Sequence, residues 1–188
     1  MRVAGGKFGG RMLVAPDDRR VRPTSDKVRQ ALFNILEHRD FGDFTLEGAR
    51  AIDLFAGTGA LGVEALSRGA RFCLFVDDDT DSRALVRQNV EALGLTGISK
   101  IWRRDAAELG PMNTGSGGPF ELAFLDPPYR KGLADAALKS LRDGGWLAPG
   151  ALLVVETAID ETLAAAGYEK LDERDYGETR VIFLAAST

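Results

Sequence analysis

Apolar and polar positions along the chain follow two alternating patterns. From residue 49 onward, short apolar runs are separated by longer segments in which apolar residues recur at the spacing of one helix face. The runs predict buried strands over Ala51–Phe55, Phe72–Val76, Ser99–Arg103, Leu122–Leu125 and Leu152–Val155. The longer segments predict helices over Ala60–Ser67, Asp81–Leu93 and Leu133–Arg142. This alternation is typical of an α/β fold, in which a mainly parallel sheet carries helices on both faces.

The C-terminal part of the chain breaks this alternation. Tyr168–Arg174 and Thr179–Leu184 are extended runs joined by a turn at Tyr176-Gly177, so we expect an antiparallel hairpin that brings the sheet to seven strands. Residues 113–119 are rich in Gly, Ser and Asn, which predicts a flexible surface loop.

The N-terminal part is also distinct. Glycine pairs within Arg2–Val14 separate short β-like pieces, which predicts a small ribbon. A helix is then expected to begin at Thr24 or Ser25, because these residues are favoured N-caps. Its buried stripe recurs at helical spacing, and the helix is expected to end near His38.

Composition narrows the class of protein. The chain has 188 residues, 45% of them hydrophobic and 28% charged, which suits one globular domain with its own core. No apolar run approaches the about 18 residues of a membrane span, and the first residues lack the apolar core of a signal peptide. Cys73 is the single cysteine, so no internal disulfide can form. We therefore expect a cytoplasmic protein that acts as a monomer.

Charge is distributed unevenly. Residues 1–29 hold eight basic and three acidic side chains, a net charge of +5. The net charge of the whole chain is −4, so the remaining residues together carry −9. We call residues 1–22 the basic arm. Such asymmetry favours a polyanionic partner, with a solvated surface ribbon as the alternative. If the partner is RNA, the phosphate-binding side chains are expected to be Arg2, Lys7, Arg11, Arg19 and Arg20.

A glycine-rich turn follows the first predicted strand. Gly57, Gly59 and Gly62 fit the G-x-G-x-x-G spacing, in which backbone N–H groups at a helix start face a ligand. Asp53 precedes this turn near the carboxyl end of the strand, where open α/β sheets bind ligands. A carboxylate there would repel a pyrophosphate and attract a cation. D-x-F-x-G-x-G therefore favours S-adenosylmethionine, a sulfonium, over a nicotinamide dinucleotide.

Further acidic residues follow later strands. Asp77 comes 20 residues after Gly57, the separation at which a carboxylate commonly accepts hydrogen bonds from ribose hydroxyls. Asp78 is an alternative ribose ligand, and Asp79 is an alternative helix cap. Asp105 either accepts a bond from an adenine amino group or caps the next helix.

Asp126-Pro127-Pro128-Tyr129, which we call the D-P-P-Y corner, is the most specific chemical signal. Two consecutive prolines end a strand and leave carbonyl oxygens exposed. Asp126 and the Pro127 carbonyl can accept the two N–H bonds of an exocyclic amino group, localising its lone pair toward a methyl donor. Tyr129 can stack on the base that carries this amino group.

Together these motifs resemble the D-P-P-Y-type S-adenosylmethionine-dependent amino-methyltransferases of nucleic acids. R-V-A-G-G-K-F-G-G-R at residues 2–11, R-P-T-S-D-K-V-R at 22–29 and L-F-N at 32–34 are similar to the bacterial 16S ribosomal RNA guanine-N2 methyltransferase family. The resemblance reaches from Arg2 to the hairpin at residues 176–180. It implies a Rossmann-like class I methyltransferase domain over residues 23–188, preceded by the basic arm.

The resemblance also implies a substrate and a set of site residues. The target is a guanine of 16S ribosomal RNA, within an assembling small subunit. Catalysis would involve Asp126, Pro127, Pro128 and Tyr129, without a metal. The predicted cofactor-binding residues are Thr24, Asp53, Phe55, Gly57, Thr58, Gly59, Asp77, Asp78, Asp105 and Ala106.

Other functions remain open on the residues alone. D-P-P-Y serves any exocyclic amino group, so a DNA or RNA adenine-N6 methyltransferase is one alternative. The short arm is small beside the interface of about 1,000–2,500 Å² that sequence-specific DNA binding requires. A non-catalytic RNA-binding assembly factor is the second alternative. A nicotinamide oxidoreductase would leave Asp53 and D-P-P-Y without a role.

Overall fold

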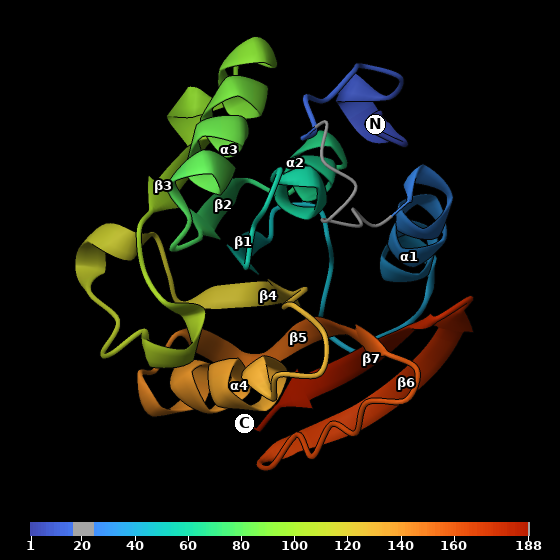
Figure 1. Cartoon of the computed structure of the whole chain (residues 1–188), viewed down its shortest axis with the longest axis vertical. Helices are drawn as coiled ribbons and strands as arrows, with labels where there is room; N and C mark the ends of the chain where they lie inside the picture. The colour runs from blue at the N-terminus through green and yellow to red at the C-terminus, as the bar shows by residue number, and fades with distance from the viewer. Residues whose placement is uncertain (17–24, 188) are drawn as a thin grey trace.

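The computed structural model describes residues 1–16 and 25–187. Within them a seven-stranded sheet runs in the order β3-β2-β1-β4-β5-β7-β6 (Figure 1). The strands are β1 (Arg50–Leu54), β2 (Phe72–Val76), β3 (Ser99–Trp102), β4 (Phe120–Leu125), β5 (Leu147–Ala158), β6 (Tyr168–Tyr176) and β7 (Thr179–Ala186). The helices are α1 (Asp26–His38), α2 (Ala60–Ser67), α3 (Thr80–Ala92) and α4 (Leu133–Asp143). The α/β class predicted from the periodicity is confirmed.

The strand pairing follows from how the strands are connected. β1 to β5 pair in parallel because the segments between them cross over the sheet, and most of these segments contain a helix. β7 pairs antiparallel with both β5 and β6, as the predicted closing hairpin requires. β5 begins five residues earlier than predicted, at Leu147 instead of Leu152. Pro149 and Gly150 obscured this start, and the β4–β5 register shifts beside them.

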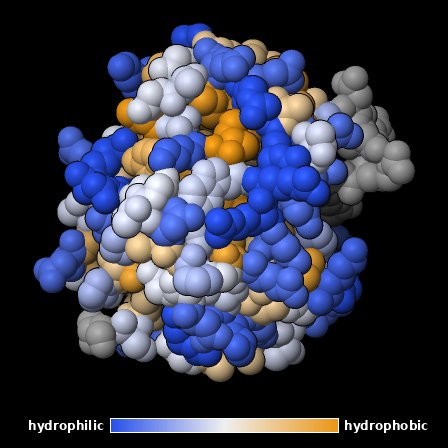
Figure 2. Space-filling view, turned by 90° about the vertical axis from the view of Figure 1, so that its left-hand side faces the viewer, coloured by the Kyte–Doolittle hydropathy of each residue, from blue (hydrophilic) through white to orange (hydrophobic). Residues whose placement is uncertain are grey.

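Two apolar clusters cover the faces of the sheet. On one face α1, α2 and α3 pack over residues such as Phe75, Phe124 and Phe183. On the other, α4 and the turns before β4 pack over Trp146 and Leu153 (Figure 1). α2 is buried at all eight positions, because it crosses the middle of the sheet. The face that contains the β3 edge is mostly hydrophilic, with scattered apolar residues (Figure 2).

The described part of the basic arm is a compact turn. Arg2 and Met12 form one antiparallel bridge, and Gly6–Phe8 form a 3₁₀ turn between them, in place of a continuous ribbon. Val3 and Leu13 are buried in the same cluster as α2, so residues 1–16 are packed on the domain. The boundary predicted between residues 22 and 23 falls outside the described residues.

Residues 113–119 are packed more closely than a loose surface loop. They form a 3₁₀ turn, and the side chain of Ser116 is buried. Gly117 has a φ of +89° and lies against the Phe72 ring, where a Cβ atom would come within 2.4 Å of the ring.

No helix among residues 1–16 and 25–187 is long and apolar enough to cross a membrane.

Candidate active site at the carboxyl edge of the sheet

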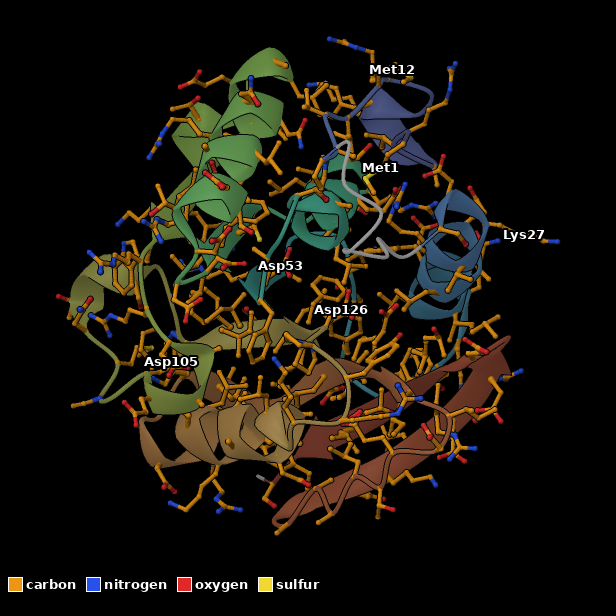
Figure 3. All side chains as sticks on the ribbon, viewed as in Figure 1. Met1, Met12, Lys27, Asp53, Asp105 and Asp126 are labelled. Atoms are coloured by element: carbon orange, nitrogen blue, oxygen red, sulfur yellow. The ribbon has the colours of Figure 1, made fainter. Side chains whose placement is uncertain are left out.

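Five strand ends meet at one edge of the sheet. Leu54 is in register with Val76 on one side and with Leu125 on the other. The register continues outward from Val76 to Trp102 and from Leu125 to Val155. The residues that follow these strands therefore leave the sheet together, which brings Phe55, Asp77 and Asp126 to one edge. Asp53 lies in β1, and Asp126 directly follows the neighbouring strand β4 (Figure 3).

The segment Phe55–Gly59, which we call the glycine loop, has an unusual backbone. Gly57 and Gly59 have φ angles of +59° and +81°, a region that glycine occupies without steric cost. Phe55 also has a positive φ of +57°, although it carries a side chain. Such outliers cost about 1–3 kcal/mol and cluster at binding and catalytic sites. The backbone conformation thus agrees with the prediction that this loop faces a ligand.

Asp77 braces the glycine loop. Its Oδ2 accepts a 2.9 Å bond from the Gly57 N–H, and its Oδ1 accepts a 2.9 Å bond from the Asp79 N–H. Burial raises the pKa of Asp77, and the neighbouring Asp78 adds to the shift. Asp79 accepts a bond from Ser82 N–H, so the alternative of a helix cap is confirmed for it. Asp78 is exposed. The ribose role of Asp77 and Asp78 stays a prediction.

Asp53 is buried beneath the loop. Its side chain is 1% exposed, and Oδ2 accepts a 3.0 Å bond from the Gly62 N–H in α2. Loss of water raises its pKa well above the ordinary value, and the charges of Asp77 and Glu156 add to this effect. The carboxyl group thus orients the start of α2, a role that the sequence did not predict. Its cofactor role stays a prediction.

Gly62 has a packing function. A Cβ atom at this position would lie 2.4 Å from the Phe75 ring and 2.7 Å from the Cys73 sulfur. Only glycine therefore lets α2 approach β2 this closely. At Gly57, by contrast, a Cβ atom would meet only the Phe55 carbonyl oxygen, at 3.9 Å. Space is thus open on the side of the loop where a ligand is expected.

Asn89, which the sequence analysis missed, fastens the loop to the arm. Its side-chain N–H group donates to the Thr58 carbonyl at 2.8 Å and to the Val14 carbonyl at 3.1 Å. Its Oδ1 accepts a 2.7 Å bond from the Val14 N–H. The Thr58 hydroxyl lies 3.6 Å from the Met1 sulfur, and its oxygen accepts a 3.3 Å bond from the Ala60 N–H. Met1 thus contacts the glycine loop directly, and Val14 is joined to it through Asn89.

Glu64, also missed, anchors the start of the arm. Its fully buried carboxylate accepts bonds from the Ala4 and Gly5 N–H groups at 2.8 and 2.9 Å. It also pairs with the guanidinium groups of Arg29 and Arg68, at 3.1 and 2.8 Å. A buried charge needs such partners. The signal was present in the sequence, because Glu64 is the charged residue within an otherwise apolar helix.

The D-P-P-Y corner leaves β4 beside the loop. Pro127 is buried, Asp126 and Tyr129 are partly exposed, and Pro128 is exposed. The Tyr129 and Thr179 hydroxyl oxygens are 2.9 Å apart. Burial raises the pKa of Tyr129, so its hydroxyl stays protonated near neutral pH. The corner places one carboxylate and one aromatic ring, both partly exposed, at the edge of the sheet.

The remaining predicted residues are dispersed. Asp105 accepts a 2.9 Å bond from the Ala107 N–H, so the alternative of a cap is confirmed, and Ala106 is buried in the turn that follows. The arm cations are exposed at residues 2, 7 and 11, where Arg11 donates to the Ala92 carbonyl at 3.5 Å. Thr24, Arg19 and Arg20 lie outside the described residues. Within the described ranges, no three His, Cys, Asp or Glu side chains could hold a metal.

Known proteins share this architecture. The model of the family described as conserved hypothetical protein 95 matches residues 1–185. The chain is 36% identical over 165 residues to ribosomal RNA small subunit methyltransferase D of Escherichia coli, covering 87% of this chain and 77% of that protein. It is 37% identical over 156 residues to the putative rRNA methyltransferase YlbH of Bacillus subtilis, covering 83% and 82%. A solved structure of the putative methyltransferase yhhF from Escherichia coli has a TM-score of 0.81 at 30% identity, covering 100% and 98%.

Proposed function

Because the chain belongs to the 16S ribosomal RNA methyltransferase family described as conserved hypothetical protein 95, we propose that it transfers a methyl group from S-adenosylmethionine to the N2 amino group of a guanine in 16S ribosomal RNA. The observation that carries this proposal is the placement of the D-P-P-Y corner beside the glycine loop. Leu54 and Leu125 are in register, so both segments leave the sheet at the same level.

The proposed cofactor site is the open side of the glycine loop. The cleared space at Gly57 and the absence of a side chain there allow close approach of a ligand to the loop backbone. Asp53 and Asp77 place two carboxyl groups beneath the loop, and ionisation of either would be favoured by a cationic ligand and opposed by a pyrophosphate. The bound sulfonium would supply an electrophilic methyl group. Asp105 and Thr58 remain proposed cofactor contacts, although their side chains also cap local turns.

The proposed chemistry assigns each corner group a task. Asp126 and the Pro127 carbonyl accept the two N–H bonds of the guanine amino group and direct its lone pair toward the methyl carbon. The nitrogen–carbon bond forms as the carbon–sulfur bond breaks, and the proton released from nitrogen passes to the Asp126 carboxylate or to water. Tyr129 stacks on the guanine, a contact of about 1–3 kcal/mol per base. Pro128 stiffens the turn. The proposal requires neither a metal nor a covalent enzyme intermediate.

The proposed substrate is 16S ribosomal RNA within an assembling small subunit. An RNA enzyme can take specificity from the shape of a folded substrate, so the short arm suffices as a docking element. A cytoplasmic, monomeric enzyme stays our prediction.

Methyl transfer from labelled cofactor tests this function. The parent protein would be offered 16S ribosomal RNA, small subunits and duplex DNA, with mass mapping of the product. We expect methylated guanine in the RNA or the subunits. An exposed carboxylate on α4 offers a matched control, because Asp143→Ala removes a charge far from the corner and should leave the rate unchanged. Methylated adenine in DNA, or cofactor binding without transfer to any substrate, would contradict the proposal.

The basic arm can be tested by salt dependence. Arg11→Ala removes an exposed cation, so substrate binding should weaken and the slope of log K against log salt should fall by about one unit. The sequence suggests that the arm leaves cofactor affinity alone, but Asn89 joins the arm to the glycine loop. Cofactor titration of the same variant is therefore the control. An unchanged slope with unchanged affinity would return the arm to the alternative of a surface ribbon.

A further inference from the structure

A contact between two hydroxyl groups attaches the D-P-P-Y corner, which follows β4, to β7, a strand that is not adjacent to β4 in the sheet. Tyr129 follows β4, whereas Thr179 begins β7, which lies on the far side of β5 in the sheet. Their hydroxyl oxygens are 2.9 Å apart although the residues are 50 positions apart in the chain. Thr179 is itself held between two strands, in register with Ala158 of β5 and Tyr176 of β6. The anchor is therefore part of the sheet and not of a loose loop.

A second attachment fixes the residue that follows. The Arg130 N–H donates to Glu161 Oε2 at 3.1 Å, and the same carboxylate accepts a 3.5 Å bond from the Ala158 N–H at the end of β5. The Arg130 guanidinium pairs with Asp160 at 2.9 Å. Arg130 has a φ of +62°, so the chain turns sharply directly after Tyr129. The backbone of the corner is thus held independently of the Tyr129 hydroxyl.

The geometry points to Thr179 as a positioning residue for the proposed reaction, and this inference rests on the proposed function. The phenol oxygen lies on the axis about which the ring rotates. A bond to that oxygen fixes the direction of the ring axis and leaves rotation about the axis possible. We propose that Thr179 holds the Tyr129 ring pointing along the edge of the sheet, where it stacks on the target guanine before Asp126 engages the amino group.

This role predicts which kinetic step is affected. In the proposed function, contacts between the arm and phosphates provide most of the RNA affinity, and the corner adds only the contact to one base. Without the bond to Thr179, the bound RNA should present its guanine correctly for a smaller fraction of the time. The single-turnover rate constant at saturating RNA should therefore fall, while RNA affinity and cofactor affinity stay the same.

Three variants isolate the hydroxyl pair. Tyr129→Phe keeps the ring and removes one partner, Thr179→Val keeps the shape and removes the other, and Thr179→Ser retains the hydroxyl. The matched control is Tyr168→Phe, because Tyr168 on β6 donates its hydroxyl to the Leu138 carbonyl at 2.6 Å, far from the corner. Single-turnover methylation of small subunits, RNA binding, cofactor titration and thermal unfolding would be measured for each, and for the double variant.

Tyr129→Phe and Thr179→Val should each lower the rate constant by about two- to tenfold, the range that one net hydrogen bond provides. The double variant should be no slower than either single variant, and Thr179→Ser should match the parent. Tyr168→Phe should lower stability without changing the rate. Losses that multiply in the double variant, or a parent-like Tyr129→Phe, would overturn the inference. A parent that methylates no substrate would overturn the proposed function and this inference with it.

Discussion

The glycine loop is held from its buried side, whereas the D-P-P-Y corner is held from its exposed side. The buried side chains of Asp53 and Asn89 and the partly buried side chain of Asp77 form hydrogen bonds to the backbone of the loop and of the start of α2. The corner is joined to β7 by one hydroxyl pair. Arg130, which follows the corner, is held by an N–H bond to Glu161 and by an exposed ion pair with Asp160. A non-glycine residue with positive φ lies in the loop, Phe55, and another directly follows the corner, Arg130.

The difference has a physical consequence. Buried bonds are protected from water and salt, so changes beneath the loop should alter stability together with cofactor binding. Exposed bonds are weak and screened, so the corner should tolerate substitution without unfolding. Stability and chemistry are thus expected to be coupled in the loop and separable in the corner.

The largest expected effect separates chemistry from binding at the corner. Asp126→Ala removes the proposed acceptor of the amino group, so turnover should fall by about 10²–10⁴-fold, the range for loss of a positioned proton acceptor. Cofactor affinity should stay unchanged. Asp126→Asn keeps a carbonyl acceptor and should lose less. Single-turnover rates and calorimetric titration would measure both, and a parent-like rate in Asp126→Ala would refute the proposed chemistry.

Two glycines of the loop region should separate packing from ligand access. Gly62→Ala places a methyl group against Phe75 and Cys73 and should cost about 1–3 kcal/mol of unfolding free energy. In Gly57→Ala the added methyl group makes only an ordinary contact with the Phe55 carbonyl oxygen, so its cost should be limited to the strain of a positive φ, about 1–2 kcal/mol. Only Gly57→Ala should weaken cofactor binding in the folded protein. Denaturant unfolding would measure the two stability costs, and cofactor titration would measure the two affinities. Equal cofactor affinities in Gly57→Ala and Gly62→Ala would argue against the proposed site.

Asp53 couples stability to pH. Burial raises its pKa above the ordinary 3.8, so between the unfolded and folded pKa values the folded state binds more protons. The unfolding free energy therefore falls as pH rises through that window, and it stays lower above it. Asp53→Asn still accepts the Gly62 N–H bond but cannot ionise, so its stability relative to the parent should increase with pH. Its cofactor affinity should decrease. Parallel stability curves for the two proteins would exclude this account.

The smallest effect is expected at the outer side of the corner. Arg130→Ala breaks an exposed pair with Asp160, while the Arg130 N–H bond to Glu161 is retained. The melting temperature should not change, and the single-turnover rate should fall less than in Thr179→Val. At high salt, the single-turnover rate of Arg130→Ala should equal that of the parent, because salt screens the exposed ion pair. A clear loss of stability would show that the corner is held more rigidly than the comparison implies.

Periodicity predicted the elements well, because burial imposes it directly. The strand Phe72–Val76 and the helix Ala60–Ser67 have the predicted bounds. The supporting polar groups were not predictable in the same way. Asn89 belongs to a helix with ordinary polar positions, and its partners Val14 and Thr58 are distant in sequence. A spacing rule assigned Asp77 to a ribose, but it cannot show that a carboxylate also faces the backbone of the loop before it.

The attachment of the arm also sets an order of events. Ala4 is bound by a carboxylate 60 residues later in the chain, and Val14 by an amide 75 residues later. The arm is synthesised before α2 and α3, yet its anchors exist only once both helices have been made and have packed. Docking of the arm must therefore follow the formation of both helices. Until then, a nascent chain carries an undocked basic segment.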